Sequence, residues 1–341
     1  MSRILEKRVK RIEVMDPPSI DGLALVDVPQ PEPGPGEVTV RVRASSLNFH
    51  DYLVVTGVMA PEAGRVPLSD GAGEVVSVGS AVTTLVPGDR VIGTYFTDWL
   101  DGSPTAGAIR RMRGEQVDGF ASEFVVKRES DLVKVPQGLS HEEAATLPCA
   151  GLTAWRALMV EGRLKPGDTV LVQGTGGVSI FALQFARMAG AEVIALTSSD
   201  AKREKLEALG ARHVLNYREE PEWGSRVKAL TGGRGVDHVV EVVGGDLTQT
   251  LRACRVGGQV LMVGALSRKP IQFPAGLVIT GNIRVTGLTV GSRAHLEQMM
   301  RAIARNELRP VIDRVFPLAE IKDAFRHQEA KAHFGKICIA I

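Results

Sequence analysis

A glycine-rich stretch near the middle of the chain has the residue types and spacing needed to bind a phosphate group. It consists of Gly174, Thr175, Gly176 and Gly177. It follows an apolar run and precedes a helical pattern that begins at Val178, and Ser179 replaces the last glycine of the usual pattern. Glycines at a strand-to-helix turn let a diphosphate approach the backbone and bind the first amides of the helix. We therefore predict a dinucleotide site; the alternative is a tight turn that binds no nucleotide.

The residues after the next predicted strand indicate which dinucleotide is bound. NAD-binding enzymes commonly carry an acid there, about 20 residues after the glycine turn, which accepts hydrogen bonds from the ribose. This chain has Thr197, Ser198 and Ser199, followed by Lys202 and Arg203. Hydroxyls and a cation bind a 2′-phosphate through charge-assisted hydrogen bonds, whereas an acid would repel it. NADP(H) is therefore preferred and NAD(H) is the alternative, which applies if Lys202 and Arg203 only form the solvated face of a helix.

The sequence gives no positive reason to expect a metal. The cysteines Cys149, Cys254 and Cys338 are far apart, and no His, Cys or Glu spacing places two ligands on one helical face. Isolated cysteines without a disulfide framework fit a reducing compartment.

Two kinds of pattern must position these residues. Short β-type runs separated by Pro and Gly turns fill the first third of the chain, which is typical of a barrel or a sandwich. Later, amphipathic helices alternate with continuous apolar strands, which predicts a parallel sheet covered on both faces. The predicted strands are 38–44, 73–78, 89–92, 122–126, 169–173, 192–196, 213–216, 236–243, 259–263, 283–288 and 336–341. The predicted helices are 141–159, 178–189, 201–209, 222–231, 247–253, 293–306 and 318–329.

Length and pattern together predict two domains. A chain of 341 residues exceeds the size at which one core usually keeps growing. We assign residues 1–149 to a β-rich catalytic domain and residues 150–290 to a doubly wound parallel α/β domain. Because the parallel sheet is complete by about Val290, residues 291–341 are expected to return to the first domain.

Composition excludes several classes of partner. The 41 Lys and Arg residues nearly balance the 39 Asp and Glu residues, and no dense basic block is present, so nucleic acid is not expected. No apolar run is long enough to span a bilayer, and residues 1–15 lack the apolar core of a signal peptide. We therefore expect a cytoplasmic protein with no membrane partner.

Several short motifs resemble the medium-chain dehydrogenase/reductase superfamily over nearly the whole chain. Besides the glycine turn, they are Pro35-Gly36-Glu37-Val38, Gly71-Ala72-Gly73-Glu74-Val75, Pro87-Gly88-Asp89-Arg90-Val91, Gly151-Leu152-Thr153-Ala154 and Ala208-Leu209-Gly210-Ala211. Each motif is short, but their order and spacing are specific. The resemblance implies a GroES-like β-barrel catalytic domain, a Rossmann domain and a homodimer formed through the edges of the Rossmann sheets.

Within this superfamily the chain resembles the zinc-free branch, which includes quinone oxidoreductases and enone reductases. The positions that match the zinc ligands and their surroundings hold Asn48, Ser69 with Asp70, and Cys149, and a single thiolate does not hold a tetrahedral catalytic zinc. The loop 97–119, where other members bind a structural metal, contains no cysteine.

The resemblance also assigns cofactor-binding residues. Tyr217 matches a tyrosine that helps to bind the adenosine phosphate of NADP, and Lys336 matches a basic position near the cofactor. The complete predicted set is Asn48, Thr153, Gly174, Thr175, Gly176, Gly177, Val178, Thr197, Ser198, Ser199, Lys202, Tyr217, Val243, Gly264, Leu288 and Lys336.

The implied reaction is hydride transfer to a quinone or an α,β-unsaturated carbonyl. It leaves an enolate or phenolate oxygen, which hydrogen-bond donors and then a proton can neutralise. Asn48 is expected to orient the nicotinamide or the substrate oxygen. His50 occupies the position of a proton-relay hydroxyl and is a candidate donor, and Tyr52 is the alternative donor. A structural role stays open for both His50 and Asp51.

Two other function classes remain at this point. An alcohol dehydrogenase or carbonyl reductase would use the same cofactor site, but it needs a stronger polarising group than Asn48. A nonenzymatic NADPH-binding protein would keep the glycine turn and tolerate loss of His50 and Tyr52.

Overall fold

The computed structural model describes residues 7–341, which form two compact units. Unit 1 contains the described residues up to Cys149 together with Gly291–Ile341, and unit 2 is Ala150–Val290. The part of the N-terminal stretch before residue 7 lies outside the described residues. Within 7–341, no helix combines the length and the apolar composition that crossing a bilayer requires.

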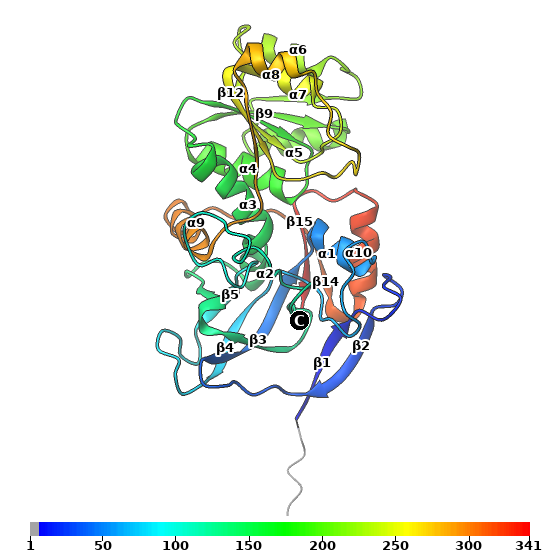
Figure 1. Cartoon of the computed structure of the whole chain (residues 1–341), viewed down its shortest axis with the longest axis vertical. Coiled ribbons are helices and arrows are strands. Elements are labelled where there is room, and N and C mark those ends of the chain that lie inside the picture. Colours follow the sequence, from blue (N-terminus) through cyan, green and yellow to red (C-terminus); the bar gives the residue numbers. More distant parts are fainter. Residues whose placement is uncertain (1–6) are drawn as a thin grey trace, which may run out of the picture. The chain divides into compact units, whose positions relative to one another are not determined.

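Unit 2, whose residues are all described, is built on a parallel six-stranded sheet (Figure 1). The strand order is β10-β9-β8-β11-β12-β13. The first strand of this unit, β8, therefore lies at the centre beside β11, and the chain builds the sheet outward from β8 in one direction and from β11 in the other. This is the doubly wound arrangement, and it confirms the predicted fold class. The strands are β8 (Thr169–Gln173), β9 (Glu192–Thr197), β10 (His213–Asn216), β11 (Val236–Glu241), β12 (Cys254–Met262) and β13 (Arg284–Gly287).

Helices connect the parallel strands and cover the sheet. Both central strands, β8 and β11, are buried along their whole length. Burial on both faces explains the continuous apolar run Val170–Val172 in β8, whereas β11 also buries the polar residues Asp237, His238 and Glu241. Helix α4 packs on β8 and β9, and α6, α7 and α8 pack on β12. The helices are α3 (Leu152–Trp155), α4 (Gly177–Met188), α5 (Arg203–Ala208), α6 (Trp223–Leu230), α7 (Thr248–Ala253) and α8 (Ala275–Gly281), with a 3₁₀ turn at Asp200–Lys202.

The helix predicted over 141–159 begins as expected but is interrupted. Ser140 caps it, because its Oγ accepts a hydrogen bond from Glu143 N at 3.1 Å while Glu143 Oε2 accepts one from Ser140 N at 2.7 Å. Helix α2 (His141–Ala145) then gives way to wider π-helical turns at Leu147–Gly151 and Arg156–Glu161, on either side of α3. Pro148 lies in the first of them, where a residue without an amide hydrogen does not continue a regular helix.

The described part of unit 1 contains a seven-stranded sheet and a separate hairpin. The sheet runs β14-β15-β3-β4-β5-β7, and β6 also pairs with β3. Its strands are β3 (Glu37–Ser46), β4 (Ala72–Val78), β5 (Arg90–Gly93), β6 (Phe124–Arg128), β7 (Leu132–Lys134), β14 (Ile312–Pro317) and β15 (Lys336–Ala340), and the hairpin is β1 (Arg8–Glu13) with β2 (Ala24–Pro29). The remaining helices of unit 1 are α1 (Phe49–Val55), α9 (Arg293–Asn306) and α10 (Ile321–Glu329), with 3₁₀ turns at Glu129–Asp131 and Leu318–Glu320.

The last strand of the chain completes the sheet of unit 1. Strand β15 pairs antiparallel with β3, so that Cys338 lies opposite Ser46, and it pairs parallel with β14. In Figure 1 the red C-terminal segment runs beside the blue strand β3. Phe325 and Ile339 share one buried cluster with Leu47 and Val55. This pairing brings the start of β15 next to the start of α1.

A buried arginine anchors the loop 97–119 of unit 1. Arg113 is 2% exposed, and its Nε donates a hydrogen bond to Thr94 O at 2.8 Å. Its Nη2 lies 2.9 Å from Asp131 Oδ2, so the two side chains form an ion pair, although the geometry is not that of a hydrogen bond. Its guanidinium lies 5.6 Å from the ring centroid of Phe120, within the range of a cation–π contact. Charge and burial, rather than cysteines, therefore hold this loop against the sheet.

Candidate functional site

The glycine turn in unit 2 forms an open backbone cradle at the carboxyl end of β8. Gly174 has a φ of +76°, which favours glycine, and a Cβ added at Gly174 or Gly176 would meet no atom within 4 Å. Helix α4 starts at Gly177 with Gly176 as its N-cap, and no side chain from residues 7–341 caps it. The amides of Gly177 and Val178 therefore begin a 12-residue helix beside an unfilled space. The predicted residues fit a diphosphate group.

Ser179, which replaces the last glycine of the pattern, is used inside the unit. Its Oγ donates to Gln173 O at 2.6 Å, and the side chain is 3% exposed. The hydroxyl therefore ties the first turn of α4 to the end of β8 and does not fill the cradle.

The residues predicted to select NADP(H) gather at the same edge of the sheet. Lys202 Nζ donates to Thr175 Oγ1 at 3.1 Å, which brings a cation to the glycine turn. Tyr217 N donates to Thr197 O at 3.1 Å, and the Tyr217 side chain is 42% exposed beside this loop. The Thr197 hydroxyl is buried and hydrogen-bonds to the backbone of Ser199. Of the predicted hydroxyls, those of Ser198 and Ser199 are partly exposed.

One acid near this edge was not considered in the sequence analysis. Asp200 follows β9 by three residues, and its carboxylate accepts from Arg203 Nη2 at 3.1 Å and from Asn216 Nδ2 at 3.3 Å. The hydrogen bond from Arg203 lowers the pKa of Asp200. Neighbouring side chains thus already occupy both carboxylate oxygens of Asp200.

The other predicted residues of unit 2 lie at strand ends or in a helix. Val243, Gly264 and Leu288 follow β11, β12 and β13 at the carboxyl edge of the sheet. Gly264 is required by packing, because an added Cβ would lie 2.9 Å from Val242 O. Thr153 is buried in α3 and belongs to unit 2, as the glycine turn does.

A buried glutamate that the sequence analysis missed organises this edge. Glu241, 1% exposed at the end of β11, accepts from the amides of Val243 at 2.8 Å and Gly244 at 3.0 Å through Oε1. Its Oε2 accepts from Gln173 Nε2 and Thr250 Oγ1, each at 2.8 Å. The sequence signal was an acid placed between two pairs of valines, Val239-Val240 and Val242-Val243, because a carboxylate buried there must find donors. Glu241 links the loop after β11 to the end of β8.

In unit 1 the Asn48 side chain is held by a buried polar network. Asn48 Nδ2 donates to Ser69 Oγ at 3.2 Å and to Asp70 Oδ2 at 2.8 Å, and Asn48 Oδ1 accepts from Lys336 Nζ at 2.5 Å. Ser46 Oγ also donates to Asp70 Oδ2, at 2.7 Å. Both N–H donors of the amide are therefore engaged inside unit 1.

Lys336, predicted as a cofactor contact, is built into this network. It is 3% exposed, donates to Leu47 O at 2.7 Å, and lies 3.6 Å from Asp70 Oδ2. Burial raises the pKa of Asp70 to about 6, and the charge of Lys336 opposes that shift. Asp70 Oδ1 is buried and finds no hydrogen-bond partner in the described part of the chain.

The residues of α1 meet different partners. Asp51 is buried and accepts from Asn48 N through Oδ2 and from Ser69 N through Oδ1, each at 2.8 Å, which is the structural acceptor role considered above. His50 Nε2 lies 2.6 Å from Glu115 Oε2 in the anchored loop. Tyr52 OH donates to Glu329 Oε1 at 2.8 Å, on α10. The two candidate proton donors therefore belong to separate hydrogen-bonded groups.

The positions that match zinc ligands do not form a metal site of the usual kind. Among residues 7–341, no group of three or more His, Cys, Asp or Glu side chains is arranged to hold a metal ion. Burial raises the pKa of the Cys149 thiol well above its usual value, which favours the neutral thiol over the thiolate that binds zinc. Asn48 and Ser69 supply no thiolate or imidazole. The residues do not fit a catalytic zinc.

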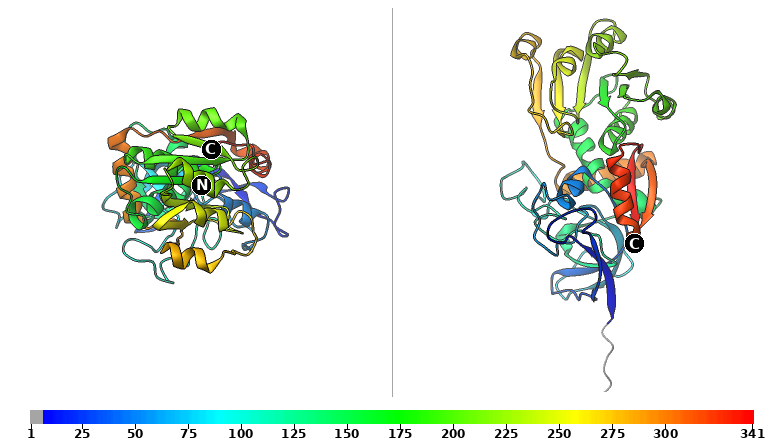
Figure 2. Two further views of the ribbon diagram at one scale, coloured as in Figure 1. Left: turned by 90° about the horizontal axis from the view of Figure 1, so that it is seen from above. Right: turned by 90° about the vertical axis from the view of Figure 1, so that its right-hand side faces the viewer.

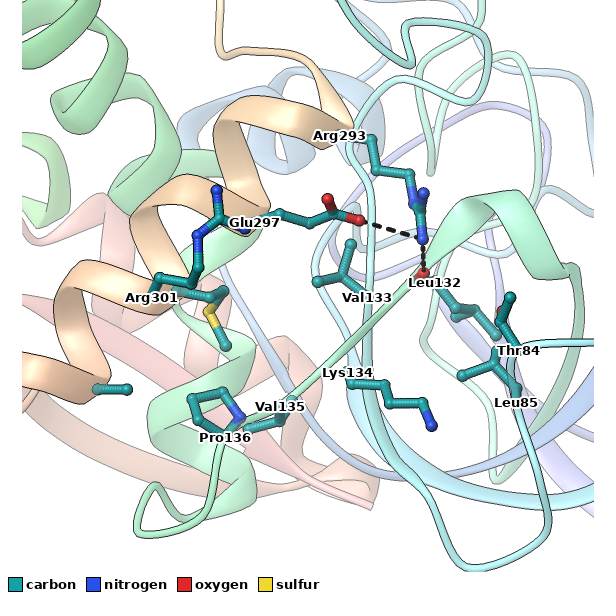
Figure 3. Close-up of a pocket in the computed structure, with 12 residues that line it drawn as sticks. Thr84, Leu85, Leu132, Val133, Lys134, Val135, Pro136, Arg293, Glu297 and Arg301 are labelled. Carbon is teal, nitrogen blue, oxygen red and sulfur yellow. Dashed lines mark hydrogen bonds and ion pairs between the residues drawn. The ribbon is translucent and has the colours of Figure 1, made fainter.

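A cavity of about 440 Å³ lies elsewhere in unit 1, between β7 and α9 (Figure 3). Arg293 donates to Leu132 O at 3.4 Å and pairs with Glu297 Oε1 at 3.2 Å at its border. Its lining residues include none of the predicted site residues, so the cavity is separate from the candidate site.

Comparison with known proteins assigns both regions to families. Residues 34–137 match the alcohol dehydrogenase GroES-like domain, and residues 177–305 match the zinc-binding dehydrogenase family. A zinc-type alcohol dehydrogenase-like protein from Schizosaccharomyces pombe is 40% identical over 309 residues, which cover 88% of this chain and 89% of that protein. An acryloyl-coenzyme A reductase from Metallosphaera sedula is 30% identical over 337 residues, which cover 96% of this chain and 95% of that protein.

Solved structures show the same architecture. A candidate alcohol dehydrogenase from Sinorhizobium meliloti has a TM-score of 0.93 and 40% identity, covering 99% of this chain and all of that one. An NAD-dependent alcohol dehydrogenase has a TM-score of 0.89 and 33% identity, covering 97% of this chain and 99% of that one. A quinone oxidoreductase from Coxiella burnetii has a TM-score of 0.78 and 28% identity, covering 98% of this chain and all of that one.

The raised pKa of Asp70 predicts a specific dependence of stability on pH. The carboxyl keeps its proton up to about pH 6 when folded but only to about 3.8 when unfolded, so stability falls as pH rises through this window. The size of this loss is on the order of 3 kcal/mol. We expect Asp70→Asn to remove this pH dependence, because asparagine does not titrate. Between pH 4 and pH 7 the wild type should therefore lose unfolding free energy relative to the variant. Urea unfolding across this range measures the change; a constant difference would contradict the assignment.

Proposed function

Since the chain belongs to the medium-chain dehydrogenase/reductase superfamily of oxidoreductases, we propose that it transfers hydride from NADPH to a quinone or an α,β-unsaturated carbonyl without zinc. The observation that carries the proposal is the pair of features at the carboxyl edge of unit 2: the open glycine turn and the Lys202–Thr175 contact beside it. A nicotinamide dinucleotide, when bound, supplies the hydride. The acryloyl-coenzyme A reductase and the quinone oxidoreductase among the relatives support this choice of substrate class.

The preference for NADP(H) rests on charge at the end of β9. A 2′-phosphate is a dianion that charge-assisted hydrogen bonds stabilise. Lys202 supplies the charge, Ser198 and Ser199 supply hydroxyls, and Tyr217 presents an exposed ring. Asp200 and Glu219 are nearby acids; Arg203 and Asn216 already bind the carboxylate of Asp200, and Asn216 also donates to Glu219.

Replacing Lys202 tests the cofactor preference. We expect Lys202→Ala to weaken NADPH binding by at least about tenfold, because a hydrogen bond to a charged group contributes about 1.5–3 kcal/mol. NADH binding should change little, since NADH carries no 2′-phosphate. Lys205→Ala on the exposed side of α5 is the matched control. Calorimetric titration of the three proteins with each coenzyme measures the affinities, and equal affinity of the wild type for both coenzymes would contradict the preference.

The substrate class follows from the donors that remain in unit 1. An isolated carbonyl needs strong polarisation before it accepts hydride, whereas an enone or quinone delocalises the developing charge. Both N–H donors of Asn48 are already engaged with Ser69 and Asp70, so its amide is a fixed group rather than a strong electrophile. We assign His50 as the proton donor and keep Tyr52 as the alternative.

A panel of oxidised substrates separates the candidate functions. We expect NADPH oxidation with quinones and enones, and at least tenfold slower turnover with simple aldehydes and ketones. Turnover of aldehydes alone would support the alcohol dehydrogenase or carbonyl reductase activity that the names of the relatives suggest. No turnover with any class, despite NADPH binding, would indicate a nonenzymatic binding protein. Metal analysis of the same active preparation tests zinc independence, and stoichiometric zinc would overturn it.

A homodimer formed through unit 2 is also part of the proposal. Strand β13 stands at the edge of the parallel sheet, as Figure 2 shows, and an open edge can pair with another chain. Helix α8, which follows the exposed Phe273, contains no buried residue, and its Ile279 is 73% exposed. These apolar side chains favour a protein contact on the same unit.

Light scattering tests the homodimer. We expect a mass of twice 36.5 kDa for the wild type and a shift toward the monomer for Ile279→Lys, because association would bury the added charge. Val86→Lys, at a 58% exposed position of unit 1, is the matched control. A monomeric wild type at micromolar concentration would contradict this part of the proposal.

A further inference from the structure

Glu115, in the anchored loop of unit 1, makes a close contact with the candidate proton donor. Its Oε2 lies 2.6 Å from His50 Nε2, and the two side chains are 13% and 11% exposed. A hydrogen bond to a carboxylate is stronger in such a largely buried setting than on an open surface. Nothing in the residue types of the loop predicted this contact, because Glu115 and His50 are 65 residues apart in the chain.

The backbone around Glu115 holds its carboxylate in place. Gly114 has a φ of +78° and donates its amide to Val117 O at 2.8 Å, and Gln116 N donates to Met112 O at 3.1 Å. The neighbouring residue Arg113 is anchored by Thr94 and Asp131. Gln116 Nε2 donates to the second carboxylate oxygen of Glu115. The carboxylate is thus a fixed partner for His50 rather than a mobile surface group.

The other nitrogen of His50 has a different environment. Nδ1 is buried, finds no hydrogen-bond partner within residues 7–341, and lies 3.9 Å from Asp51 Oδ1. The rings of Tyr95 and His50 pack in an edge-to-face arrangement, with the ring centroids 5.4 Å apart and the planes at 70°. The ionisable groups around His50 are therefore Glu115 on the loop, Asp51 on its own helix and Tyr95 after β5. Two carboxylates face the two nitrogens.

We propose that Glu115 is a positioning residue that, by accepting the Nε2–H of His50, leaves Nδ1 as the nitrogen that exchanges the proton of the reaction. A carboxylate on one imidazole nitrogen fixes the ring orientation and the tautomer. Hydride adds to the substrate carbon, the resulting enolate or phenolate takes the proton from Nδ1–H, and Nδ1 regains a proton from water. Nε2–H and Glu115 are unchanged at the end of the cycle. This inference rests on the proposed function, in which His50 donates the proton.

The rate part of the test is a double-mutant cycle. We expect Glu115→Gln to lower kcat/KM about tenfold or more, with NADPH affinity unchanged. In the His50→Gln background, Glu115→Gln should cause no further loss, because Glu115 acts through His50. Asp101→Asn, an exposed acid on the same loop, is the control. Additive losses in the two backgrounds would overturn the proposal.

Nitrogen NMR provides a second readout that does not depend on activity. With ¹⁵N-histidine labelling the chain gives seven imidazoles, and the His50 signals are those lost in His50→Gln. We expect neutral His50 to carry its proton on Nε2 in the wild type and to populate both tautomers in Glu115→Ala. An unchanged tautomer would overturn the role of Glu115. If the tautomer responds but His50→Gln keeps full turnover, His50 is not the proton donor and this inference is wrong. Hydride transfer itself is tested separately, by turnover in the substrate panel.

Discussion

A buried positive charge holds the beginning and the end of unit 1 together. A lysine ammonium inside a protein is stable only when its donors are matched, and Lys336 meets this condition with Leu47 O, Asn48 Oδ1 and the carboxylate of Asp70. All three partners come from the first 70 residues, whereas Lys336 opens the last strand. Because the same lysine binds all three partners, the Asn48 amide is held in one orientation. The start of α1 is held beside the start of β15 for the same reason. The contacts of Lys336 therefore fix the start of α1, the helix that carries the proposed proton donor.

In unit 2, backbone amides rather than charged side chains are available to bind an anion. Its helix α4 begins with uncapped amides next to the open turn, and Glu241 satisfies the amides of the neighbouring loop. A site that binds an anion needs unsatisfied donors in one place, and the adjacent loop must be satisfied from within so that it keeps its shape. The two units therefore differ in how they stabilise charge. Unit 1 fixes side chains around a buried lysine, and unit 2 presents backbone amides to an anion at the edge of its sheet.

The sequence predicted what depends on local pattern. Continuous apolar runs identified the strands of the parallel sheet, and the predicted helix 293–306 has the same bounds as α9, because its apolar positions recur with helical spacing. Helix α8 buries no residue and left no such signal, and β14, mostly exposed, was missed for the same reason. The contacts of Lys336 with Asn48, 288 residues apart, and of Glu115 with His50 arise only from tertiary structure. Sequence reasoning named the candidate residues but did not find their hydrogen-bond partners, and the site assignment itself stays a prediction.

The pairing of β15 with β3 also determines when unit 1 can be completed during synthesis. Unit 2 is continuous in sequence, so all of its strands are available once Val290 has left the ribosome. Strand β3 and the buried acid Asp70 are made early, whereas strand β15 and Lys336 follow only after all of unit 2. Until then the end of β3 is an open sheet edge and Asp70 lacks its charged partner, and an open edge of this kind is prone to association with other chains.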